Sequence, residues 1–147
     1  MTSIPRPALL LGLAGLIPFL WGALTVVLPG LAEWGTEIMG PRFVGPYVQL
    51  FYGAIILAFM SGVLWGFAAQ GSDWQGYALS VLPALWAFFM TGGGADRAAA
   101  ALIVGFLGLL ALDRHFWKRG LAPQWWMRLR VLLTLVVVNA LAVDLIF

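Results

Sequence analysis

Long apolar runs alternate along this chain with short breaks that are rich in glycine, proline or charge. A membrane-spanning helix needs about 20 predominantly apolar residues. None of the runs alternates with the period of two that a membrane β-barrel strand requires, and backbone groups in lipid must then be satisfied within a helix. The pattern predicts an all-α polytopic membrane bundle of five transmembrane helices in a single domain, 1–147, with spans at 8–28, 47–69, 76–91, 95–112 and 129–146.

Composition supports a membrane protein and excludes several other classes. The chain is 63% hydrophobic and 10% charged, with a mean hydropathy of +0.97, whereas soluble domains average about 45–50% apolar and 25% charged residues. A soluble fold of 147 residues would lack the polar side chains to cover its surface. We therefore exclude a soluble enzyme, a disordered protein and a nucleic-acid binder.

Two features of the apolar runs have more than one interpretation. The first run is longer than the roughly 7–15 apolar residues of a signal peptide, which favours a membrane span, although Gly30-Leu31-Ala32 loosely resembles a cleavage site. Pro18 and Pro83 fall inside the first and third runs. Each removes a backbone donor and should kink its helix. Such a kink is either a purely structural feature or a hinge for gating.

The basic residues predict an orientation. With five spans, six of the eight Lys and Arg residues fall on the side of the N-terminus, and only Arg42 and Arg97 fall on the other side. Cytoplasmic loops carry the excess of basic residues in membrane proteins. We expect the N-terminus inside and the C-terminus outside.

Small residues recur at intervals of three and four in several runs. Such stripes let helices approach closely in lipid. We interpret them as packing faces, with a ligand cleft or pore as the alternative, and assign to this role Ala54, Ala58, Gly62, Gly66, Ala101, Gly105 and Gly108. Trp86 lies deep in the third run beside Phe88 and Phe89, where it either packs in the core or stacks on a quinone or pigment.

Polar side chains within the runs are few, and such residues are functional candidates by default. Asn139 is the strongest polar group near the middle of the membrane, and we expect its amide to bridge to a neighbouring helix. Asp144 lies about one turn from the end of its helix, where we expect it to reach water. With no Cys and a single His, His115, the chain offers no usual catalytic, cofactor or metal site.

The most distinctive segment is the break at 113–130, in which basic residues alternate with tryptophans at a membrane boundary. Cations and indoles suit an anionic lipid surface. One interpretation is that the segment only fixes the orientation of the protein in the membrane. The other is a binding site for anionic lipid or a partner, formed by Arg114, Lys118, Arg119, Trp125, Trp126, Arg128 and Arg130.

The order of several short blocks resembles a known family. These blocks are 12–19, 52–59, Gly62, Trp65-Gly66, 80–83, Asp113, 123–126, Leu129-Arg130 and Leu133-Thr134. They resemble the small bacterial inner-membrane proteins grouped as domain of unknown function 3429, whose eukaryotic relatives are mitochondrial transmembrane proteins. The resemblance implies a five-helix protein of the bacterial, or in a eukaryote the mitochondrial, inner membrane. It implies no activity and no catalytic residues.

Three functions remain open from the sequence. We favour a non-enzymatic accessory, assembly or stabilising protein that binds anionic lipid and other membrane subunits or a second copy of itself. The alternative is a carrier or channel for a small solute, acting as a monomer or a homodimer, with Ser61, Ser80 and Asn139 as the start of a polar path. A membrane enzyme or redox protein fits least.

Overall fold

The chain folds into helices joined by short turns. The structure is a computed structural model that describes residues 3–71 and 73–147, and these residues contain no strand. In chain order the elements are α1 Arg6–Ala14, α2 Ile17–Val27, α3 Pro29–Met39, the 3-10 helix η1 Pro41–Phe43, α4 Tyr47–Ala68, α5 Trp74–Ser80, α6 Leu82–Met90, α7 Ala95–Lys118 and α8 Trp126–Ile146. The prediction of an all-α protein is confirmed.

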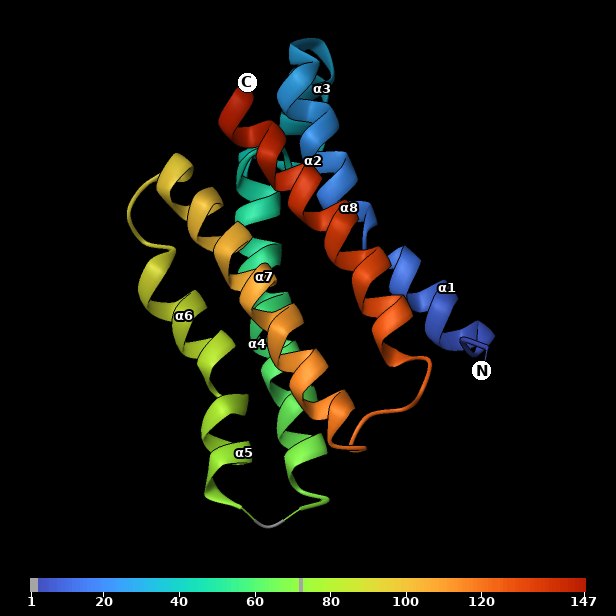
Figure 1. Cartoon of the computed structure of the whole chain (residues 1–147). Helices are drawn as coiled ribbons and strands as arrows, with labels where there is room; N and C mark the ends of the chain where they lie inside the picture. The colour runs from blue at the N-terminus through green and yellow to red at the C-terminus, as the bar shows by residue number, and fades with distance from the viewer. Residues whose placement is uncertain (1–2, 72) are drawn as a thin grey trace.

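The long helices pack side by side around α4. This helix contacts α2, α5, α6 and α7, while α8 packs on both α2 and α7 (Figure 1). Leu57, Leu64, Leu102, Phe106 and Leu141 form the fully buried centre. The N-terminus lies near the start of α8, and the C-terminus lies at the opposite end of the bundle near α3 (Figure 1).

Four helices in the described residues are long and apolar enough to cross a membrane. They are Arg6–Val27, which combines α1 and α2, and then Tyr47–Ala68, Ala95–Lys118 and Trp126–Ile146. The prediction of five such helices is therefore wrong at the third run. That run forms the 7-residue α5 and the 9-residue α6, separated at Val81. The orientation derived from five spans loses its basis with this correction.

Proline explains why the first and third apolar runs are each interrupted within the run. Pro18 and Pro83 each occupy the second position of their helices, α2 and α6. A proline has no N–H to donate to the carbonyl four residues earlier, and its ring collides with that carbonyl. Each run is accordingly divided into two helices, α1 and α2 at Pro18 and α5 and α6 at Pro83, which agrees with the predicted disruption at both prolines.

The segment 113–130 is mostly helical, contrary to the prediction of a long loop. Helix α7 continues to Lys118 and α8 begins at Trp126, so the connection is only 119–125. Charged residues do not end a helix, whereas Gly120, with φ of 76°, adopts the left-handed conformation common after a helix end. Pro123 follows in the same connection.

Only some of the small residues predicted to form packing faces are packed against neighbouring helices. Ala101 is buried, Ala54 contacts the core, and a Cβ on Gly105 would lie 2.8 Å from Trp86 and 2.9 Å from Leu57. By contrast, Ala58, Gly62, Gly66 and Gly108 are exposed, and a Cβ on any of these glycines would meet nothing within 4 Å. The predicted packing role does not hold for these four within the chain. Helix α4 instead turns Gly53, Leu57, Leu64 and Ala68 inward.

Two polar residues also lie elsewhere than predicted. Asn139 is exposed and donates to the Leu135 carbonyl of its own helix over 2.7 Å, so it does not bridge helices. Asp144 is 9% exposed, and neither carboxylate oxygen has a hydrogen-bond partner among the described residues. Its position near a helix end therefore does not bring it to water, because neighbouring helices cover it.

Candidate functional site

A buried polar cluster joins α7 to α8 at the end of the bundle where the basic residues collect. Asp113 is completely buried. It accepts a hydrogen bond from Arg130 Nε over 2.8 Å and another from Trp126 Nε1 over 2.9 Å. Arg130 itself is only 6% exposed. A buried charge must be paired and hydrogen-bonded to be tolerated, and here both oxygens of the carboxylate are engaged.

The predicted basic site is therefore divided. Arg130 and Trp126 turn inward to Asp113, which corrects their assignment to a surface site for anionic lipid or a partner. The other basic residues, Arg114, Lys118, Arg119 and Arg128, are exposed, and Trp125 is half-buried. Of the predicted site, these residues are the ones on the surface of the described chain.

A second set of contacts fixes the connection between α7 and α8 against α5. Arg119 forms an ion pair with Asp73, with Nη2 and Oδ2 3.0 Å apart. Asp73 also accepts from the Gly76 N–H over 3.1 Å and so caps α5. The Gly76 hydrogen bond, followed by the Arg119 hydrogen bond, lowers the pKa of Asp73 below its ordinary value. Gln70 adds a hydrogen bond to the Leu121 carbonyl over 3.3 Å.

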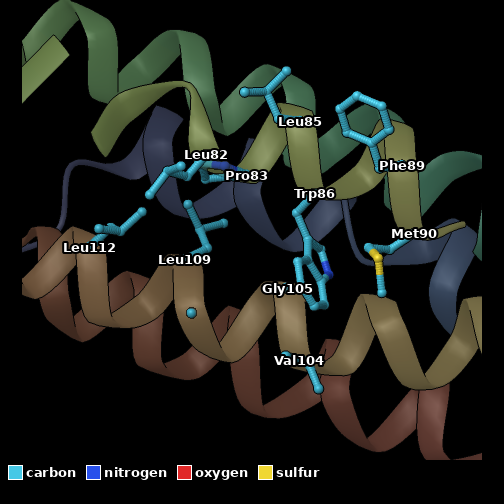
Figure 2. A pocket seen from close by; sticks show the side chains of 11 residues that line it. Leu82, Pro83, Leu85, Trp86, Phe89, Met90, Val104, Gly105, Leu109 and Leu112 are labelled. Atoms are coloured by element: carbon cyan, nitrogen blue, oxygen red, sulfur yellow. The ribbon is translucent and has the colours of Figure 1, made fainter. Parts of the chain in front are cut away.

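The larger cavity is an apolar groove of about 610 Å³ between α6 and α7. Figure 2 shows Leu82, Leu85 and Phe89 on α6 and Leu109 and Leu112 on α7 along it, with Trp86 reaching across toward Gly105. The Trp86 N–H donates to the Ala101 carbonyl over 2.6 Å. Since that polar atom is engaged within the protein, the groove offers apolar surface to an occupant.

The groove is aligned with the basic end of the bundle, the end where the basic residues of α7 and α8 collect. Its α7 side consists of Val104, Gly105, Gly108, Leu109 and Leu112, and residues three to four apart share one helix face. The same face continues through His115 to Arg119. His115 is half-buried, and its Nε2 has no hydrogen-bond partner among the described residues.

The comparisons with known proteins place this architecture in a family. Residues 4–146 match the family described as "Protein of unknown function (DUF3429)". The chain belongs to this family. The resemblance drawn from the short sequence blocks is thus confirmed, and the family description gives no activity.

Two curated relatives carry the name transmembrane protein 69. The one from Xenopus tropicalis is 37% identical over 153 residues, which cover 99% of this chain and 56% of the relative. The one from Mus musculus is 36% identical over 149 residues, covering 97% of this chain and 56% of the relative. This family member therefore spans about half the length of those relatives. No solved structure matches it.

Sequence reasoning missed Asp113 as a partner and the α6 side of the groove. Asp113 directly follows the predicted span 95–112, and only the extension of α7 to Lys118 places it and Arg130 on adjacent helices joined by a short connection. Trp86 was singled out, but Leu82 and Leu85, which line the groove with it, were not.

Proposed function

We propose that this membrane protein is a non-enzymatic accessory component that holds an anionic lipid on its surface and binds other membrane subunits. The groove between α6 and α7, aligned with the basic end of α7, carries the proposal. An anionic phospholipid has the same two parts in the same order, an apolar chain and a charged head. The bacterial inner membrane, or the mitochondrial inner membrane in a eukaryote, is the proposed location.

The groove suits an acyl chain. Its volume of about 610 Å³ lies within the range of roughly 300–1,000 Å³ typical of ligand sites. Leu82, Leu85 and Phe89 on its α6 side are exposed, so the groove is open toward the surrounding lipid. An acyl chain lying in it would make dispersion contacts along its length.

The head of the lipid would lie at the basic end. Lys118 is exposed there, and the Arg119 side chain remains 42% exposed despite its pair with Asp73. Basic residues near an anionic membrane surface contribute about 1 kcal/mol each. His115 Nε2, which has no hydrogen-bond partner in the described part of the chain, lies on the helix face between the groove and these cations.

The polar residues favour this role over that of a carrier. A solute path would need free polar groups in sequence through the bundle. Ser61 instead accepts from the Ala84 N–H, Ser80 donates to the Tyr77 carbonyl, and Asn139 donates to its own helix. The three residues considered for such a path are thus each engaged in a hydrogen bond to the backbone.

The test compares two glycines on open surface, of which one lies in the groove. In Gly108→Leu the new side chain would occupy the groove without a clash, whereas Gly62→Leu would add the same bulk on α4. Each variant is purified from membranes in mild detergent, and bound phosphatidylglycerol and co-purifying subunits are measured by mass spectrometry. We expect Gly108→Leu to lose bound lipid and Gly62→Leu to retain it.

A second variant addresses the head group. Lys118→Gln removes an exposed cation from the basic end of α7, beyond the groove, and Arg42→Gln removes one from η1 as a control. Lipid retention should fall only in Lys118→Gln. Equal lipid recovery from the wild type, Gly108→Leu and Lys118→Gln would contradict the lipid site, and the absence of any specific co-purifying subunit would contradict the accessory role.

A further inference from the structure

A second cavity, separate from the α6–α7 groove, lies among α1, α2, α4, α7 and α8 and has a volume of about 300 Å³. Most of its lining is apolar, but Arg130, Thr134 and Tyr52 bring polar groups to it. We propose that this cavity binds the carbonyl-bearing head of a neutral, lipid-soluble molecule. Apolar cavities with a few convergent polar groups are the usual form of small-molecule sites.

The polar side of the cavity has an unused donor. Thr134 is 3% exposed, and its Oγ1 has no hydrogen-bond partner among the described residues. Leaving a buried polar group unpaired costs free energy, and a hydroxyl in a helix ordinarily bonds to a carbonyl of its own turn. A ligand oxygen in the cavity would supply the missing acceptor.

Arg130 lies one turn before Thr134 on α8 and lines the same cavity. Its Nε is committed to Asp113, and that bond does not require the two terminal nitrogens of the guanidinium. Donors from both residues can therefore converge on one ligand oxygen.

Charge balance determines the class of ligand. Arg130 is neutralised by Asp113 at 2.8 Å, so an added anion would bring a net negative charge into a buried site, where desolvation is expensive. A neutral acceptor avoids that cost and still accepts hydrogen bonds. A carbonyl group meets both requirements.

The entrance to the cavity faces the membrane. Leu11 and Phe59, which line it, are 74% and 65% exposed on the outside of α1 and α4. Both are apolar, so a molecule would enter from the lipid and not from water. Quinones and the ester groups of neutral lipids share this chemistry of a carbonyl on a lipid-soluble molecule.

Binding is measured on the whole purified chain in detergent with two probes, decyl-benzoquinone and dioctanoylglycerol, by equilibrium dialysis. Thr134→Val keeps the side-chain shape and removes the donor. We expect saturable binding of at least one probe and an affinity about five- to tenfold lower in Thr134→Val, as for the loss of one hydrogen bond. Thr36→Val is the control, because that hydroxyl bonds within α3 to the Ala32 carbonyl.

A thermal measurement distinguishes a lost contact from a damaged fold. Without probe, Thr134→Val should unfold at the wild-type temperature or above it, since it removes a buried unpaired group. Ile56→Phe adds bulk to the cavity and should weaken binding independently. If only one probe binds, it shows which class of natural ligand the cavity takes: a quinone for decyl-benzoquinone, or a neutral ester lipid for dioctanoylglycerol. Failure of both probes to bind, or wild-type affinity in Thr134→Val, would overturn the proposal.

Discussion

At the scale of single residues, the pair formed by Asp113 and Arg130 is the most consequential contact between α7 and α8. Both members are buried, and Trp126 satisfies the second carboxylate oxygen. Removing one partner of such a pair leaves an uncompensated buried charge, which typically costs about 3–5 kcal/mol.

We therefore predict that Asp113→Asn sharply lowers the thermal stability of the protein in detergent. The neighbouring Arg114 is exposed, and Arg114→Gln should change stability by less than about 0.5 kcal/mol. Thermal unfolding followed by circular dichroism measures both variants. Similar midpoints for the two would show that the pair contributes little to the fold.

A pH dependence is predicted for Asp73. Its pKa lies below the ordinary value of 3.8, because the Gly76 N–H and Arg119 favour the charged form. The contribution of this charge is therefore complete above the unfolded-state pKa and is lost as pH falls through the lower folded-state pKa. Wild type should exceed Asp73→Asn in stability at neutral pH, and the difference should vanish in acid. A difference that stays constant from pH 7 to pH 2 would contradict this assignment.

The sequence predicted where the cations collect but not which way each points. Arg128 and Arg130 are two residues apart on one helix and look equivalent in the printed chain, yet one is exposed and the other buried. The difference arises from the rotation of α8 against α7, which brings Arg130 to Asp113. That rotation is set by packing along the full length of both helices, so local sequence does not reveal it.

At the scale of elements, the break between α5 and α6 needs a partner for the backbone that it frees. The Ala84 N–H donates to Ser61 Oγ on α4 over 2.8 Å. We predict that Ser61→Ala destabilises the protein by about 1 kcal/mol, because it leaves the partly buried Ala84 N–H without its acceptor. Ser61→Thr, which keeps a hydroxyl, should recover part of the loss in the same unfolding assay. Equal stability of Ser61→Ala and wild type would show that the break is satisfied otherwise.

Glycine substitutions should separate packed from open surfaces. A side chain at Gly105 would collide with Trp86 and Leu57, whereas one at Gly62 would meet open space. Overpacking usually costs about 1–3 kcal/mol. Gly105→Leu should therefore lower the unfolding temperature much more than Gly62→Leu. The reverse order would mean that α4 turns its Gly62 face inward.

Among the elements, proline positions were predictable and helix faces were not. Pro18 and Pro83 act locally, through a missing donor and a steric clash, so the sequence alone locates their breaks. The inward face of α4 was misassigned because in an apolar helix both faces resemble a packing surface. Leu57 and Leu64 are fully buried while Gly62 is exposed, and only the neighbouring helices decide between the two.

At the scale of the whole molecule, the basic residues gather at one end of the bundle. Lys118 and Arg119 lie there, and the C-terminus lies at the other end (Figure 1). Basic ends of membrane proteins face the cytoplasm, so we predict this orientation without reference to the number of spans.

The orientation is testable with single cysteines, because the chain has none of its own. Lys118→Cys should react with an impermeant maleimide only after the inner membrane is opened, whereas Glu33→Cys on α3 should react in intact cells or spheroplasts. Labelling with the opposite sidedness would invert the assignment. The class of fold was predictable at this scale because composition decides it. The number of full-length helices was not, because it depended on how many residues of the third run are helical, and α5 and α6 together are shorter than the combined α1 and α2.

The pair between Asp113 and Arg130 also has a consequence for the order of synthesis. The two residues are 17 positions apart, so at about 5–20 residues per second roughly one to three seconds separate their emergence from the ribosome. During this delay Asp113 lacks the partner that neutralises it in the folded protein, Arg130, and an unpaired charge in a membrane helix resists insertion. Insertion of α7 is therefore favoured only once α8 has followed, and the two helices should leave the insertion machinery together as one hairpin.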